Sequence, residues 1–119
     1  MAAGKLDLVI EQGSTFRKTL TWKTGTPSVP VNLTGFTARL QFRTSPSAAT
    51  TTLSLTDVAS AAGQIILGGV LGTVEVYIKH TTTESLVGGG AYDLELAAPN
   101  TDVTRLLQGK YSVSPNITK

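Results

Sequence analysis

The sequence predicts an all-β fold in which antiparallel strands form a two-layered sandwich, and three observations lead to this fold class. Near the C-terminus, two runs of alternating apolar and polar residues, 91–96 and 103–115, flank a Pro-Asn-Thr-Asp turn. This arrangement is typical of a β-hairpin that buries one of its faces. The same alternation recurs between turn-forming residues along the rest of the chain, and a helical pattern occurs only once.

Alternation predicts three strands in the first half of the chain, at residues 5–10, 15–22 and 36–43. The third is the clearest, because an apolar residue occupies every second position from Phe36 to Phe42. In the second strand, Lys18 falls on the apolar side. We therefore expect this strand at a sheet edge, where the lysine stem is buried and the amine stays in water.

The connections between strands carry turn-forming residues. One glycine and two prolines predict a loop at 24–30, and the small polar residues of 45–52 predict a second loop or a weak edge strand. Brief pairing is expected at 52–55. A short apolar strand follows at 64–67, and residues 73–79 alternate again.

One segment, residues 81–87, carries the helical signal. Thr81 and Glu84 have the spacing of a capping box, in which the threonine caps the first turn and the glutamate reaches back to it. Three consecutive glycines at 88–90 then end the helix. We expect about two helical turns at most.

Together these elements predict an immunoglobulin-like antiparallel β-sandwich of seven to nine short strands, with one short helical turn near 81–87. A small β-barrel is the alternative architecture. At 119 residues the chain is expected to form a single domain, 1–119, with an ordered core at 5–114 and a tail at 115–119. The large side chains expected in the core are Trp22, Phe36, Phe42 and Tyr92.

Composition excludes several classes of protein. The chain has no cysteine, which excludes a disulfide-built domain and zinc–cysteine sites. Its net charge is only +2 and its basic residues are scattered, which argues against nucleic-acid binding. No signal-peptide region and no apolar stretch of about 18 residues occurs, so we expect neither secretion by that route nor a membrane partner.

The sequence shows no grouping of catalytic residues, and we expect no enzymatic activity, no cofactor and no metal. His80 is the only histidine, and no nucleophile or orienting acid accompanies it. Asp93 and Glu95 project from the same face of one strand, as the paired carboxylates of a small hydrolase would. We favour a solvated sheet face, with these acids paired to Arg105 or Lys110 across the hairpin.

A protein interface is the one functional surface that the residues themselves indicate. Arg39, Gln41 and Arg43 form a polar row on one strand, and such a row can bind an acidic partner surface. Arginine is also common among the residues that dominate protein–protein interfaces. Tyr77 is the strand aromatic residue expected to point outward. We therefore take Arg39, Gln41, Arg43 and Tyr77 as candidate interface residues.

Several segments, in order along the chain, carry a family resemblance: IEQGSTF (10–16), VNLTGFTAR (31–39), GTV (72–74), YDLEL (92–96), TRLLQG (104–109) and VSP (113–115). They resemble small tailed-phage virion proteins related to the immunoglobulin-like N-terminal domain of phage upper baseplate proteins. That family usually has an acidic residue before Leu-Thr-Gly, where this chain has Asn32. The change preserves the turn, because asparagine and aspartate cap turns alike.

The resemblance implies a non-enzymatic structural component of a tailed bacteriophage virion. It would be a tail or baseplate adaptor in several symmetric copies, contacting other phage virion proteins after synthesis in the bacterial host cytoplasm. A capsid-surface decoration protein is the alternative, because the same fold serves that role. A carbohydrate-binding module is a further hypothesis, which requires an exposed aromatic platform.

Overall fold

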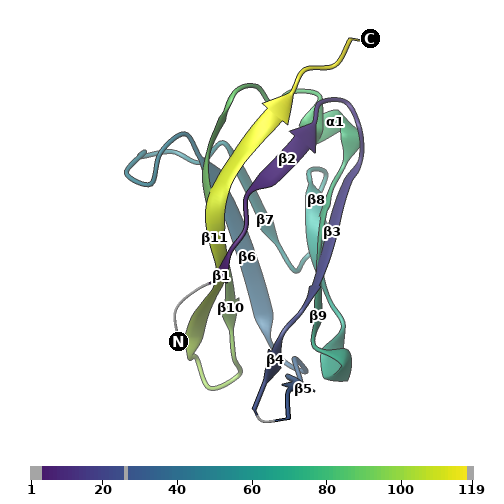
Figure 1. Ribbon diagram of the computed structural model, residues 1–119, viewed down its shortest axis with the longest axis vertical. Helices are drawn as coiled ribbons and strands as arrows, with labels where there is room; N and C mark the ends of the chain where they lie inside the picture. The colour runs from purple at the N-terminus through teal and green to yellow at the C-terminus, as the bar shows by residue number, and fades with distance from the viewer. Residues whose placement is uncertain (1–3, 26, 118–119) are drawn as a thin grey trace.

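The computed structural model describes residues 4–25 and 27–117, and it confirms an all-β sandwich. Two sheets pack face to face and enclose the apolar core (Figure 1). Residues 1–3 of the expected domain, Thr26 of the expected loop and residues 118–119 of the expected tail lie outside the described residues. Among the described residues, eight strands of four residues or more agree with the expected seven to nine, and three two-residue strands add to them.

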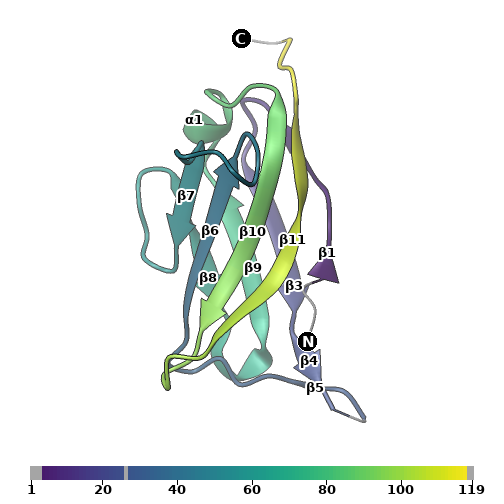
Figure 2. The same ribbon diagram turned by 90° about the vertical axis from the view of Figure 1, so that its left-hand side faces the viewer.

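The larger sheet has six strands, and its order is β1-β11-β10-β6-β7, with β2 also paired to β11. Figure 2 views this sheet from its outer side, with β7, β6, β10 and β11 side by side. The bounds of its strands are β1 (Gly4–Lys5), β2 (Leu8–Glu11), β6 (Thr37–Arg43), β7 (Leu53–Thr56), β10 (Gly89–Ala97) and β11 (Val103–Ser114).

The smaller sheet contains β3 (Phe16–Thr21), β9 (Thr73–Ile78) and β8 (Gly63–Leu67), in that order. Strand β3 is an edge strand, as the position of Lys18 predicted. The expected loop at 24–30 is in part a small hairpin of β4 (Lys23–Thr24) and β5 (Val29–Pro30). Pro30 can take part in this pairing because a short peripheral strand tolerates the missing N–H donor.

The expectation of a wholly antiparallel sandwich is wrong for the N-terminal segment, because β1 and β2 both run parallel to β11. The turn after β2 carries the chain to β3 in the other sheet. No hairpin therefore fixes the direction of β2 relative to its neighbour in the sheet. At the break between β1 and β2, the Leu6 N–H donates to the Gln108 carbonyl oxygen at 3.1 Å.

The helical segment is shorter than expected and is not capped as expected. It comprises α1 (His80–Thr83), preceded by Lys79 as N-cap without any side-chain capping bond, so the Thr81–Glu84 capping box is wrong. Instead, the buried Thr83 hydroxyl donates to the Ser14 carbonyl at 2.8 Å and ties the helix to the β2–β3 turn. An unexpected 3-10 turn, η1 (Gly69–Leu71), precedes β9. No helix in the described residues is long and apolar enough to cross a membrane.

The core forms where the apolar alternate residues of the two sheets meet. Phe42 and Tyr92 are buried as expected, and Tyr111 stacks on Phe42 with ring centroids 4.2 Å apart. Trp22 and Phe36 are only half-buried, at the end of the sandwich that carries β4 and β5, where they meet edge to face at 6.3 Å.

Candidate interaction surface

The outward side chains of β6, β10 and β11 form a continuous surface, which we call the polar face. Because β10 pairs with both neighbours, each outward residue of β10 from Ala91 to Ala97 lies between one residue of β6 and one of β11. Four such rungs cross the sheet, of which Thr37–Ala97–Val103 carries no charge and the other three make up the polar face. In the order β6, β10, β11 they are Arg43–Ala91–Lys110, Gln41–Asp93–Gln108 and Arg39–Glu95–Arg105.

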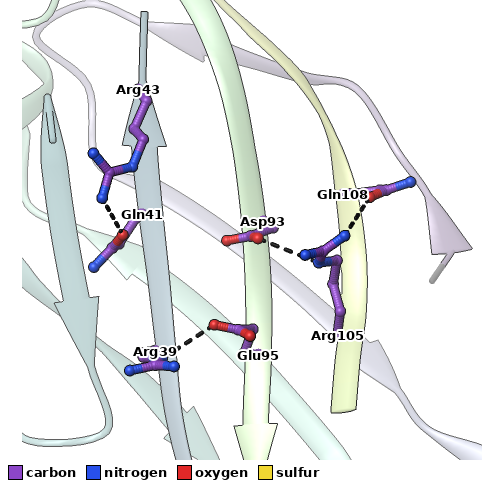
Figure 3. Close-up of polar contacts among 7 residues, drawn as sticks. All are labelled: Arg39, Gln41, Arg43, Asp93, Glu95, Arg105 and Gln108. Carbon is purple, nitrogen blue, oxygen red and sulfur yellow. Dashed lines mark hydrogen bonds and ion pairs between the residues drawn. The ribbon is translucent and has the colours of Figure 1, made fainter. Parts of the chain in front are cut away.

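Both carboxylates of the polar face are held by arginines (Figure 3). The Arg39 Nε lies 3.1 Å from a Glu95 carboxylate oxygen, and the Arg105 Nε lies 3.4 Å from an Asp93 oxygen. The predicted pairing of Asp93 with Arg105 is therefore confirmed. Glu95 pairs across the other side of its strand, with β6, and Lys110 pairs with neither acid.

The predicted row on β6 points to solvent as expected, and its upper end is held by neutral groups. One Arg43 Nη donates to the Gln41 side-chain oxygen at 3.0 Å (Figure 3), and the other donates to the Ala48 carbonyl at 2.9 Å. Arg43 is half-buried whereas Arg39 is exposed. These contacts fix the Arg43 guanidinium without neutralising its charge.

A β-bulge in β11 brings the third strand into this surface. Leu94 faces Leu107 but the next residue, Glu95, faces Arg105, so Leu106 has no partner on β10. An extra residue of this kind changes which side chains of the bulged strand point outward. Arg105 and Gln108 consequently project from the same face, and the arginine donates to the Gln108 side-chain oxygen at 3.3 Å (Figure 3).

A groove of about 1130 Å³ lies over the polar face and is lined by residues of all three rungs. One wall is the N-terminal segment from Lys5 to Val9, and the other is the loop after β6, at Thr44 to Pro46. The floor includes Ala91, which carries only a methyl group. The groove therefore combines one wall that carries charged residues with room above the sheet.

Tyr77 does not belong to this surface. It lies on β9 of the smaller sheet and points away from the core, on the opposite side of the sandwich from β6. The Arg17 guanidinium covers its ring, with the central carbon 4.2 Å from the ring centroid. The four candidate interface residues thus divide into a row of three and one isolated, covered tyrosine.

His80 is exposed at the start of α1, outside the sheets, whereas Asp93 and Glu95 lie on strand β10. Its backbone carbonyl accepts a hydrogen bond from the Glu84 N–H at 2.9 Å. His80 is therefore a surface residue at the start of the helix, and among the described residues no nucleophilic side chain is grouped with it.

The buried tyrosine beneath the polar face has an altered acidity. Burial, together with the nearby Asp7 carboxylate, raises the pKa of Tyr92 from its ordinary value near 10 to about 12. The phenolate form is disfavoured because burial removes its hydration and the carboxylate repels it. Tyr92 is therefore a neutral hydrogen-bond donor over the physiological range.

A family described as "LtfC-like, beta-sandwich domain" matches residues 3–113. The chain belongs to this family. Membership in the LtfC-like family agrees with the β-sandwich and with the resemblance to phage virion proteins.

Solved structures show the same fold at low sequence identity. One comes from photo-crosslinking analyses of multimeric cell-adhesive interactions of VGSC beta subunits. It is 11% identical, with a TM-score of 0.52, and the alignment covers 98% of each chain. At this identity the likeness concerns the fold alone. No curated protein matches the sequence significantly.

Sequence reasoning identified the β6 row but missed most of the surface around it. Asp93 and Glu95 were expected to be paired acids on a solvated sheet face, and neither they nor Ala91, Gln108 and Lys110 were assigned to an interface. The available signal was the alternation of β10, which places Ala91, Asp93 and Glu95 on one face. The bulge at Leu106 has a weaker signal, the adjacent leucines at 106 and 107 that interrupt the alternation.

Proposed function

We propose that the protein is a non-enzymatic structural component of a tailed-phage virion, a tail or baseplate adaptor that contacts neighbouring virion proteins through its polar face. The observation that carries this proposal is the LtfC-like family match over residues 3–113. LtfC is a phage tail-fibre-related protein, which supports a tail-related structural role. The resemblance of the ordered segments to phage baseplate modules supports the finer assignment.

The chemistry of the polar face favours contact over catalysis. General acid–base catalysis on a glycosidic bond needs one carboxyl group kept protonated and both groups facing a substrate. Asp93 and Glu95 are instead each held in an ion pair with an arginine of a neighbouring strand. A rigid sheet with fixed charges is well suited to bind a second protein, since its side chains lose little freedom on binding.

A carbohydrate-binding role receives less support from the aromatic residues. Tyr92 and Tyr111 are buried, and Arg17 covers the ring of Tyr77. Trp22 is half-buried against Phe36. None of these rings offers the open platform on which a sugar stacks.

Localisation in purified particles tests the proposal. Mature phage particles are separated into heads and tails, and the protein is quantified in each fraction by mass spectrometry and immunogold labelling. We expect it in the tail fraction, in a whole-number ratio to known tail proteins because virion components obey symmetry. Recovery with heads would replace the adaptor role by capsid decoration, and absence from both fractions would refute a virion role.

A further inference from the structure

One rung of the polar face has a methyl group where the other two have a carboxylate. Ala91 lies between Arg43 and Lys110, whereas Asp93 and Glu95 hold the same central position in the next two rungs. The three central residues belong to one strand and point to the same side. The first rung is therefore a pair of cations without the anion that the sheet supplies elsewhere.

The two cations of this rung remain unneutralised within the described part of the protein. Among residues 4–25 and 27–117, the ion pairs involve Arg17, Arg39 and Arg105, and neither Arg43 nor Lys110 takes part. Arg43 uses two of its five N–H donors on neutral oxygens, which leaves three for another acceptor.

The remaining charges of the groove do not cancel this excess. Asp7 lies nearby, but its carboxylate accepts from the backbone N–H of Lys110 at 3.0 Å. Lys5, which also lines the groove, offsets the charge of Asp7. The ion pairs of the lower rungs account for Arg39, Arg105, Asp93 and Glu95. The groove then holds three further cations, Lys5, Arg43 and Lys110, and one further carboxylate, that of Asp7.

We infer that Arg43 and Lys110 bind a carboxylate from an extended acidic segment of a neighbouring protein, which completes the first rung. This inference deepens the proposed function, on which the identity of the neighbour as a virion protein rests. A guanidinium held in a fixed orientation binds a carboxylate through two parallel hydrogen bonds, and an ammonium adds a point charge on the other side. The groove above Ala91 provides the space, and an extended chain presents alternate side chains to one side.

Direct binding to a defined peptide tests this site. The probe is a capped synthetic peptide in which glutamate and threonine alternate, and the reference peptide has glutamine in place of each glutamate. Binding to the full chain is measured by NMR chemical-shift perturbation and calorimetry. We expect the acidic peptide to bind, to shift the amide signals of Ala91, Arg43 and Lys110, and to lose affinity as salt is raised to about 0.15 M.

The decisive variant places the missing carboxylate in the protein itself. A91E should weaken the binding of the acidic peptide by about tenfold or more, because the introduced glutamate itself pairs with Arg43 and Lys110. A97E is the matched control: Ala97 is an outward alanine on the same strand, and its two cross-strand neighbours, Thr37 and Val103, are uncharged. A97E adds the same charge and should bind the peptide far more strongly than A91E does.

The folding of A91E is checked by its melting temperature, which should equal or exceed that of the unmodified protein, since opposite charges across strands are stabilising. The double variant R43Q/K110Q gives an independent route to the same loss of binding. Equal binding of the acidic and glutamine peptides, or unchanged binding by both A91E and R43Q/K110Q, would overturn the inference. The acidic segment would also be ruled out as the occupant if polyphosphate or a uronic-acid oligosaccharide bound more tightly than the acidic peptide and A91E weakened that binding.

These results are separable from the test of the virion role. A protein that is found in tails but binds no acidic peptide would keep the proposed function and lose this site. A protein that binds the peptide through Arg43 and Lys110 but is absent from particles would keep the site and lose the virion role.

Discussion

The Tyr92 hydroxyl donates a hydrogen bond to the Leu6 carbonyl oxygen, which joins the central strand β10 to a segment 86 residues earlier in the chain. The residue opposite Tyr92 on β11 is Gly109, which has no side chain to separate the two groups. The N-terminal segment, whose Lys5 and Asp7 side chains line the groove, is thus fastened to the core from below.

Removing this hydroxyl should loosen the N-terminal segment. Y92F keeps the buried ring but leaves the Leu6 carbonyl without this donor, so we expect a loss of about 1–2 kcal/mol in the free energy of unfolding. Urea denaturation measures it. Y111F is the matched control, because Tyr111 is equally buried and its hydroxyl has no recorded partner among the described residues. Equal losses in the two variants would contradict a specific role for the Tyr92 bond.

The same tyrosine should make the protein sensitive to alkali. The pKa of Tyr92 is raised in the folded protein to about 12, above its value near 10 in the unfolded chain. Between these values the unfolded chain releases the proton and the folded protein retains it, so the free energy of unfolding falls as pH rises. This contribution is fully present below about pH 10.

The contribution of Tyr92 is isolated by measuring the free energy of unfolding at several pH values between 9 and 12, for both the unmodified protein and Y92F. The unmodified protein should lose stability more steeply than Y92F over this window. Parallel curves for the two proteins would show that Tyr92 does not carry the alkaline dependence.

Gly109 should resist substitution for a steric reason. A methyl group at this position would overlap the Leu6 carbonyl oxygen, which is backbone and has no rotamer to relieve the contact. We expect G109A to cost about 2 kcal/mol or more in the free energy of unfolding. G4A is the control, since the tightest contact of a methyl group there would be the flexible end of the Leu107 side chain at 3.2 Å, and the Leu106 carbonyl oxygen would lie at an ordinary 3.5 Å. A fully stable G109A would contradict the close approach of Gly109 to the Leu6 carbonyl oxygen.

Lys18 should protect the edge of the smaller sheet from self-association. It lies in edge strand β3 together with Phe16 and Leu20, against the apolar interior. Inward-facing charges on edge strands prevent pairing between molecules. We expect K18V to form dimers or larger species in sedimentation-velocity experiments at concentrations where T19V, changed on the outer side of the same strand, stays monomeric. Identical sedimentation of the two variants would argue against this role.

The alternation of apolar and polar residues was sufficient to predict the two-layered fold and to place Arg39, Gln41 and Arg43 on an outer surface. Alternation is a local property, because successive side chains of a strand point to opposite faces whichever strand lies beside it. The same reasoning paired Asp93 with a cation of its hairpin partner, as the Arg105 ion pair shows. It failed where local signals were ambiguous, as in the capping box at Thr81.

Only the tertiary structure decided which strands meet and in which register. The parallel course of β2 beside β11, the bulge at Leu106 and the position of Ala91 between Arg43 and Lys110 depend on contacts between distant parts of the chain. So does the separation of Tyr77 from the β6 row, since membership of a sheet is set by non-local pairing. The residues that point outward were therefore evident from the sequence, whereas the pairing of strands from distant parts of the chain determined which of them became neighbours.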